Sequence, residues 1–264
     1  MHSVPGLDPP VSDNGSLSSV PGLDPPGTWP VFGPPDYKSH PSARPNPRDA
    51  PFRLQGTFRL NADTLSSVNL ARRDGELYYL ENFIPTAEAD RFLERLRAEL
   101  DWREEVVTIA GRAIQVPRLV CWHGDSEARY RYSGVVHAPE PWTEALSSLR
   151  QRVEAYCAQR FNSVLGNLYR NGDDTLGWHA DQERELGPEP YIASLSFGAE
   201  RRFDLRHNRS RETMNLPLTH GSLLLMGGQL QHHWQHRIPR MRGVRAPRIN
   251  LTFRAILPSP IRKP

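Results

Sequence analysis

The chain has 264 residues, 38% of them hydrophobic and 24% charged, with a formal net charge of +3. It contains no apolar stretch of about 18 residues and no charged start followed by an apolar run, so we expect neither a membrane partner nor a signal peptide. Two cysteines, Cys121 and Cys157, are too few for a disulfide framework and fit a reducing compartment. These features predict an intracellular monomer, cytoplasmic if bacterial and nuclear or cytoplasmic if eukaryotic.

The first part of the chain, residues 1–57, is predicted to be a Pro-rich, disordered arm. Residues 1–51 hold 13 of the 25 prolines, and SVPGLDPP occurs twice, at 3–10 and 19–26. Two copies do not make a solenoid, and proline fixes φ and removes a donor, so we expect an extended arm. A peptide docking arm is the alternative. Residues 58–264 are then one domain, with helices and a lid at about 70–160 and a core at about 161–256.

The predicted helices come first along this domain. Apolar residues between Ala89 and Leu100 follow helical spacing, which predicts a helix with Thr86 as its N-cap. A second helix is predicted near Pro141, with Leu146, Leu149, Val153 and Tyr156 on one face. Between them, β-like runs around 105–122 turn at Gly111.

Short strands follow Phe161. We predict them at 163–170, 191–197, 202–207, 213–218, 221–226, 230–236 and 248–256. Two helices followed by seven or eight short strands favour an α+β, mainly β class. The expected architecture is a double-stranded β-helix (jelly-roll) core with the helices packed outside it.

Positive charge is concentrated late in the chain. Residues 201–254 contain eleven Arg, no Lys and two acids, a net +9, so the rest of the chain carries −6. Such segregation indicates a surface that faces a polyanion, because cation contacts dominate phosphate binding. A solvated basic face, or Arg paired with acids from elsewhere in the fold, is the alternative.

A His-x-Asp pair on a strand, with one distant His, forms a facial triad that leaves positions open on a non-haem iron. Roughly 0.5 such pairs are expected by chance, and the sequence has two, His123-Gly-Asp125 and His179-Ala-Asp181. The second is favoured because it opens the strand-rich half. His207 is disfavoured as third ligand because its segment is Arg-rich and is expected to be exposed. Period-2 alternation would put His232, Trp234 and His236 on one face. Spacing alone does not choose among His207, His220, His232, His233 and His236.

The stretch 248–254 adds a separate constraint. Alternation points Arg248, Asn250, Thr252 and Arg254 to one side and three apolar residues to the other. Two Arg on an inner sheet face are costly unless an anion compensates them, and a dicarboxylate such as 2-oxoglutarate would do so through bidentate pairs. An exposed strand face is the alternative.

Six segments between about residues 105 and 256 together resemble the AlkB family of oxidative nucleic-acid dealkylases: NLYRNG, WHADQE, IASLSFG, HGSLLLM, WQHRIP and RINLTFR. They are most similar to the branch that contains the two human DNA-repair homologues. The resemblance implies that His179, Asp181 and His236 hold Fe(II), with Arg254 also needed for catalysis. It implies that 2-oxoglutarate is bound by Asn167, Tyr169, Arg248, Thr252 and Arg254, and that O₂ is the oxidant. The implied reaction removes methyl groups from alkylated DNA as formaldehyde, with succinate and CO₂ as coproducts.

The resemblance says less about the substrate. PRLVCWHGD is similar to the family's lid, which nominates Arg118, Trp122 and His123, although Trp122 could equally be a core aromatic. Gln182 stands where relatives often have an acid, and Glu183 could take over part of that role. Ala110 stands where a duplex-preferring relative has an aromatic wedge, so single-stranded DNA is favoured. RNA demethylation, protein hydroxylation on this fold and a catalytically silent nucleic-acid-binding module are the alternatives.

Overall fold

A computed structural model describes residues 68–109, 112–128, 130–132 and 135–257. The predicted arm, the domain boundary at residue 58 and Ala110 lie outside these residues. No helix among the described residues is long and apolar enough to cross a membrane.

Two long helices confirm the helical periodicity. The first, α1 (Thr86–Glu99), has Pro85 at its N-cap without a side-chain bond, so the prediction that Thr86 caps the helix was wrong by one residue. The second, α2 (Glu144–Cys157), is capped by Thr143, whose Oγ1 accepts a hydrogen bond of 3.2 Å from the N–H of Leu146. A short helix, α3 (Leu230–His233), and a 3-10 turn, η2 (Arg184–Leu186), complete the helical elements of the described part.

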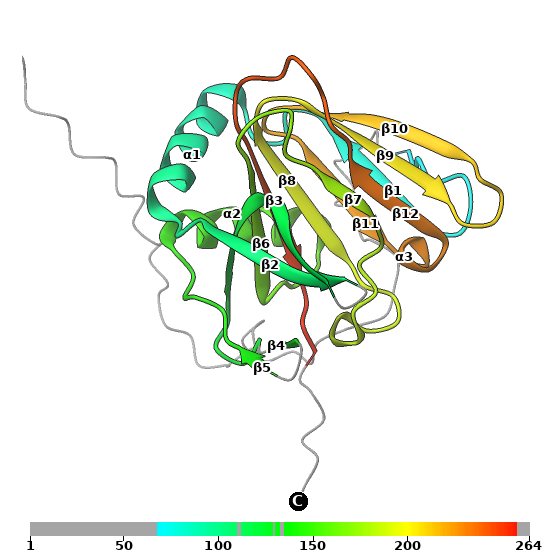
Figure 1. The fold of residues 1–264 in the computed structure, drawn as a ribbon, viewed down its shortest axis with the longest axis horizontal. Helices are drawn as coiled ribbons and strands as arrows, with labels where there is room; N and C mark the ends of the chain where they lie inside the picture. Colours follow the sequence, from blue (N-terminus) through cyan, green and yellow to red (C-terminus); the bar gives the residue numbers. More distant parts are fainter. Residues whose placement is uncertain (1–67, 110–111, 129, 133–134, 258–264) are drawn as a thin grey trace, which may run out of the picture. The chain divides into compact units, whose positions relative to one another are not determined.

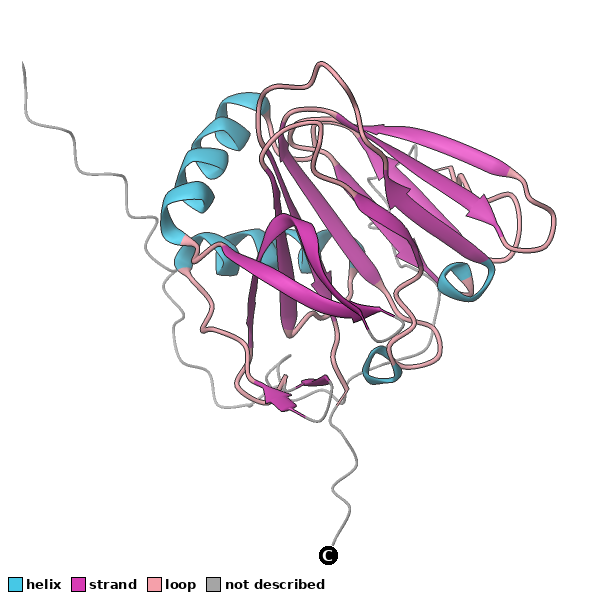
Figure 2. Ribbon diagram, in the orientation of Figure 1, coloured by secondary structure: helices cyan, strands magenta, loops and turns pink. Residues whose placement is uncertain are grey.

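Two antiparallel sheets form the jelly roll (Figures 1 and 2). The larger sheet has the order β1-β11-β8-β13-β6-β3-β2 and consists of β1 (Glu76–Leu80), β11 (Leu223–Gly227), β8 (Ile192–Gly198), β13 (Arg248–Arg254), β6 (Ser163–Tyr169), β3 (Arg112–Gly124) and β2 (Arg103–Ile109). The smaller sheet has the order β10-β9-β12-β7 and consists of β10 (Thr213–Leu218), β9 (Arg201–His207), β12 (Trp234–Ile238) and β7 (Leu176–His179). A separate pair joins β4 (Tyr130–Tyr132) and β5 (Val135–His137).

Both faces of the larger sheet are buried, because each packs against a different layer. Ile249, Leu251 and Phe253 of β13 join α1 and α2 in one apolar cluster. A second cluster, between the two sheets, contains Tyr169 of β6 and Phe203 of β9. The alternation of β13 therefore turns its polar residues toward the space between the sheets, as the sequence predicted.

The predicted strand at 230–236 was wrong in its first half. Residues Leu230–His233 form α3, and the strand begins at Trp234. His232 consequently lies on a helical turn and does not share a strand face with Trp234 and His236. Strands β1 and β7 lie outside the predicted ranges, and each is an edge strand of its sheet.

A bulge in β7 determines which way its last two residues point. His179 pairs with His236, and Leu176 pairs with Ile238, so three steps on β7 match two on β12. The extra residue places both Trp178 and Gly177 opposite Arg237, and it returns His179 to the inner face beside His236. Such a bulge re-aims a side chain next to an active site.

Gly172 holds two loops together and is predicted to be intolerant of a side chain. A Cβ on Gly172 would lie 1.9 Å from the carbonyl oxygen of Met241, whereas a Cβ on Gly177 would meet nothing within 4 Å. We expect Gly172→Ala to lower the free energy of unfolding by about 1–3 kcal/mol, as forced overpacking does. Urea unfolding measures this loss, with Gly177→Ala as the matched control. Equal losses in the two variants would contradict the steric explanation.

Candidate active site

The residues His179, Asp181 and His236 converge between the two sheets. One ligand atom from each lies within 4.8 Å of the others. The strand register places His179 directly opposite His236, and Nε2 of His179 lies 3.8 Å from Oδ1 of Asp181. Two imidazoles and one carboxylate at this spacing form a facial set suited to a divalent transition metal.

The protonation states of the two histidines favour metal binding. Nδ1 of His179 lies 2.9 Å from the carbonyl oxygen of Gly177, which can only accept, so Nδ1 carries the proton and the lone pair of Nε2 faces the site. Burial lowers the pKa of His236 to about 3, and the neighbouring His179 acts in the same direction. His236 is therefore neutral at physiological pH, as a metal ligand must be.

Asp181 is held in place from two sides. Its backbone N–H donates to Oε1 of the buried Gln231 at 2.9 Å, and its Oδ1 accepts from Nη2 of Arg254 at 2.9 Å. Burial alone would raise the pKa of Asp181, but Arg254, His236 and His179 together hold it below its ordinary value. The carboxylate is ionised at neutral pH and is available as the third ligand.

The second His-x-Asp pair does not form a metal site. Nδ1 of His123 lies 2.7 Å from the carbonyl oxygen of Pro141, while Oδ1 of Asp125 accepts from Nε1 of Trp142 at 2.7 Å and from Arg150 at 3.1 Å. Each member of the pair thus has its own structural partner.

His207 itself is buried, contrary to expectation, although residues 208–211 of its Arg-rich segment are exposed as predicted. It groups with Asp74 and His233 within 4.8 Å. The backbone N–H of Ser210 donates to Nδ1 of His207 at 3.0 Å, so Nε2 carries the proton and donates to Asp74 at 3.0 Å. This tautomer directs an N–H, and not a lone pair, toward the group.

A cavity of about 170 Å³ adjoins the triad and contains the polar side chains of β13. Arg248 is 1% exposed; its Nη2 donates to Oγ of Ser196 at 2.9 Å, and its Nε and Nη1 have no hydrogen-bond partner among the described residues. Burial lowers the pKa of Arg248 to about 10, which still leaves it charged at neutral pH. A buried guanidinium with open donors is a site for a carboxylate.

Other polar side chains of this cavity wall are held by hydrogen bonds and ring contacts. Oδ1 of Asn167 accepts from Nε of Arg118 at 2.6 Å, and Oγ1 of Thr252 donates to Oδ1 of Asn250 at 3.1 Å. The guanidinium of Arg248 lies 5.2 Å from the ring centre of Tyr169. The structure therefore brings together all the residues predicted for the metal and for 2-oxoglutarate, and all of them line this cavity.

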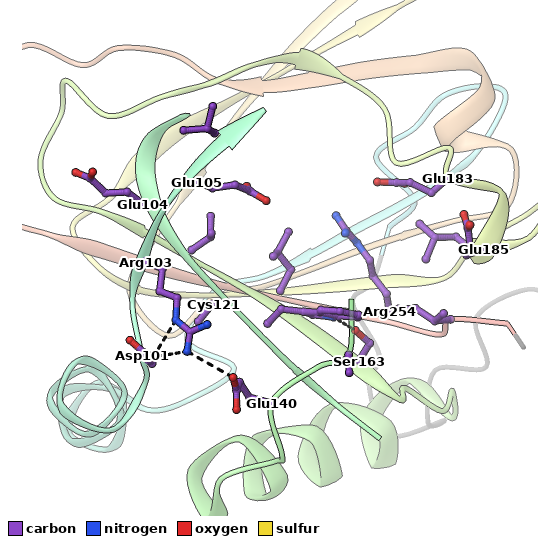
Figure 3. Close-up of a pocket in the computed structure, with 17 residues that line it drawn as sticks. Asp101, Arg103, Glu104, Glu105, Cys121, Glu140, Ser163, Glu183, Glu185 and Arg254 are labelled. Atoms are coloured by element: carbon purple, nitrogen blue, oxygen red, sulfur yellow. Dashed lines mark hydrogen bonds and ion pairs between the residues drawn. The ribbon is translucent and has the colours of Figure 1, made fainter. Parts of the chain in front are cut away.

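A second, larger cavity has a volume of about 600 Å³. Figure 3 shows the residues that line it. Leu165, Glu183 and Arg254 line both, so the two are neighbours across a shared wall. Its lining includes two Arg, Arg103 and Arg254, and six acids: Asp101, Glu104, Glu105, Glu140, Glu183 and Glu185. The acidic excess makes this cavity suited to a cationic or amino-bearing group.

The family model described as the 2OG-Fe(II) oxygenase superfamily matches residues 76–254. The DNA oxidative demethylase ALKBH2 of Mus musculus is 42% identical over 184 residues, which cover 66% of this chain and 77% of that protein. The chain belongs to the AlkB family of this superfamily. The alpha-ketoglutarate-dependent dioxygenase alkB homolog 3 of Homo sapiens is 42% identical over 188 residues, 67% of this chain. That match spans 65% of the human protein, slightly less than two thirds of its length.

The AlkB family uses Fe(II), 2-oxoglutarate and O₂, and the residues of this chain fit them. The donor set of two imidazoles and one carboxylate suits Fe(II), and the orphaned N–H groups of Arg248 suit a carboxylate of 2-oxoglutarate. Arg254 was expected to bind 2-oxoglutarate, but in the structure its Nη2 contacts the carboxylate of Asp181. It therefore bridges the metal set and the two cavities.

Only some of the residues predicted to bind the substrate of this AlkB-family chain line the two cavities. Trp122 and Glu183 line the larger cavity, and Arg118 lines the smaller one. His123 adjoins neither cavity and packs toward Pro141, and the amide of the exposed Gln182 contacts the carbonyl oxygen of Gln231. Trp122 and Glu183 are thus the nominated residues that line the larger cavity.

Three residues that position the site were not predicted. Gln231 lies on α3, where a strand was expected, so no pattern indicated its bond to Asp181. Ser196 pairs with Asn250 in the β8–β13 register and accepts a bond from Arg248, and alternation of the two strands could have indicated it. Arg201 is fully buried and lies 5.4 Å from the ring centre of Tyr169, a position unexpected for a charged residue.

Proposed function

We propose that this chain is an Fe(II)- and 2-oxoglutarate-dependent dioxygenase that demethylates alkylated bases of the 1-methyladenine and 3-methylcytosine type in DNA. The products are formaldehyde, the repaired base, succinate and CO₂. The observation that carries the proposal is the buried Arg248 with open donors, in the same cavity as the His179–Asp181–His236 set. A mere nucleic-acid-binding module has no need for this inward arrangement of a metal set and an anion site.

Different residues of the chain have different roles in the proposed reaction. Arg248 would hold a carboxylate of 2-oxoglutarate, and the triad would bind the metal through its two imidazoles and the ionised Asp181. When bound, iron and 2-oxoglutarate supply the oxidation of the methyl carbon. Arg254 keeps Asp181 oriented through its 2.9 Å bond.

The larger cavity supports the choice of substrate. Adenine alkylated at N1 and cytosine alkylated at N3 carry a positive charge in their protonated forms. Six acids and two arginines line this cavity, so the charge of its lining is complementary to such a base. Oε2 of Glu183 is buried without a hydrogen-bond partner among the described residues, and it can accept a bond from an exocyclic amino group. Trp122, fixed by its Nε1 bond of 2.7 Å to Ser163, gives an aromatic wall for the flipped base.

We further propose that the enzyme prefers single strands and acts as an intracellular monomer. Ala110 cannot fill the gap that a flipped base leaves in a duplex, which supports the strand preference. Cys121 and Cys157 are buried free thiols, which fit a reducing compartment. The large apolar side chains exposed in the described part are few: Val68, and Val106 and Ile114 on the paired strands β2 and β3. Three such side chains do not form a broad apolar interface.

Demethylation can be measured directly. The full chain with Fe(II), ascorbate and 2-oxoglutarate is incubated with methylated oligonucleotides as single-stranded DNA, duplex DNA and RNA, and loss of methyl is followed by mass spectrometry. We expect removal from single-stranded DNA at a higher rate than from duplex. Release of succinate without demethylation of any oligonucleotide would refute the proposal that nucleic acid is the substrate. Faster removal of methyl groups from RNA than from DNA would identify RNA as the preferred substrate.

A further inference from the structure

The outer face of the smaller sheet carries guanidinium groups gathered around one indole. β9 contributes Arg202 and Arg206, β12 contributes Arg237, and the bulge of β7 contributes Trp178 (strands in Figure 1). The guanidinium carbons of Arg206 and Arg237 lie 4.4 and 4.5 Å from the ring centre of Trp178. We call these four residues the arginine–tryptophan face.

The guanidinium groups of this face are held in place by few partners. Nε of Arg202 and Nε of Arg237 lie 2.8 and 2.9 Å from the oxygens of Asp204, and Nη2 of Arg206 donates to Gln235 at 3.0 Å. Arg202 and Arg237 thus share one carboxylate, and the three arginines with Asp204 carry a net charge of +2. The side chains of Arg202 and Arg237 are nevertheless 50% and 36% exposed. Guanidinium groups that are already ordered lose less conformational entropy when they bind an anion.

The loops at the two ends of this sheet add further positive charge. Arg209 and Arg211 are exposed in the β9–β10 turn, and Arg242 and Arg245 are exposed in the β12–β13 loop. In the larger cavity, by contrast, acidic residues outnumber basic ones, six to two. The protein therefore presents an acidic pocket and a basic face. An alkylated nucleotide strand has the complementary pattern, with a cationic base on an anionic backbone.

We propose that the arginine–tryptophan face binds the phosphodiester backbone of a single strand, next to the nucleotide whose base enters the larger cavity. Trp178 directly precedes the metal ligand His179, and β7 is an edge strand. A strand that leaves the cavity reaches the face around this edge. Arg206 and Arg237 contact phosphates, and Trp178 holds their planes in position. This inference rests on the proposed function only for the identity of the strand.

The test is binding, so that it stays independent of turnover. Fluorescence anisotropy with an unmethylated single-stranded DNA oligonucleotide, without iron or 2-oxoglutarate, gives the affinity at several salt concentrations. Each phosphate contact on a single strand contributes about 0.7 to the slope of log affinity against log salt. We expect the double variant Arg206→Gln/Arg237→Gln to reduce the slope by about 1.4 and to weaken binding about tenfold at 0.1 M salt.

The matched control is Arg91→Gln/Arg97→Gln, which removes the same charge from exposed positions on α1, the helix that packs against the opposite side of the larger sheet. The control should keep nearly the wild-type slope. An equal loss of slope in the control would mean that the effect comes from net charge alone. An unchanged slope in the test variant would overturn the proposal. Arg206→Lys/Arg237→Lys guards against misfolding, since it keeps the charge and should recover most of the slope. If an oligoglutamate peptide of equal length binds as tightly and competes, the face recognises an acidic protein segment and the nucleic-acid proposal falls.

Discussion

His236→Ala is expected to abolish turnover and to weaken Fe(II) binding by more than 100-fold. Loss of a residue that only orients a metal ligand already costs about 10- to 100-fold in affinity or activity, and His236 offers a ligand atom itself. Its imidazole is neutral at pH 7 because burial lowers its pKa to about 3. The variant leaves a small hole between Phe203, which stacks on the ring at 5.2 Å, and His179. Iron content after anaerobic loading and the rate of methyl loss measure the effect.

His232→Ala is the matched control, because His232 lies four residues away on α3 and contacts the carbonyl oxygen of Pro188. It should bind iron and demethylate at nearly the wild-type rate. Full activity in His236→Ala would show that a different third ligand serves the metal. The other histidines that spacing left open, His207, His220 and His233, would then be substituted in turn.

The sequence predicted most of the core because alternation and turn residues are local signals. β13 illustrates this well: its period-2 pattern predicted which residues face the space between the sheets, and the structure confirms the direction of Arg248, Asn250 and Thr252. The pattern worked there because both faces are buried against different neighbours. At Leu230–His233 the same reasoning failed, since four residues are too few to distinguish one helical turn from a strand.

Other parts of the site depend on long-range contacts that no local pattern contains. The bulge that turns His179 inward depends on the register of β7 against β12, whose paired residues are 57 or more positions apart in sequence. The bond from Gln231 to the N–H of Asp181 likewise joins two distant segments. His207 looked exposed because of its Arg neighbours, yet pairing with Trp234 across the sheet buries it. Family resemblance selected His236 where residue spacing could not.

Arg248→Met is expected to make the protein more stable and less able to bind 2-oxoglutarate. Without the cosubstrate, Arg248 is a buried charge whose Nε and Nη1 have no hydrogen-bond partner among the described residues. Replacing such a charge with an apolar side chain of similar volume is neutral or stabilising, by about 1–4 kcal/mol. Removing the partner of a bound carboxylate costs about 2–5 kcal/mol, which is roughly a 30-fold to several-thousandfold loss of affinity. Thermal unfolding under anaerobic conditions, with Fe(II) and with or without 2-oxoglutarate, measures both effects.

Arg201→Met provides the decisive contrast, because the two arginines are equally buried but differently satisfied. Arg201 donates to the carbonyl oxygens of Asn171, Asp174 and Pro239 at 2.8–2.9 Å. Its loss would leave these acceptors without their donor, so Arg201→Met should lower stability where Arg248→Met raises it. A loss of stability in both variants would mean that the protein itself compensates the Arg248 charge, and the case for an anion site would fail. Opposite signs would show that Arg248 is kept at a cost in stability, which only a ligand that binds it explains.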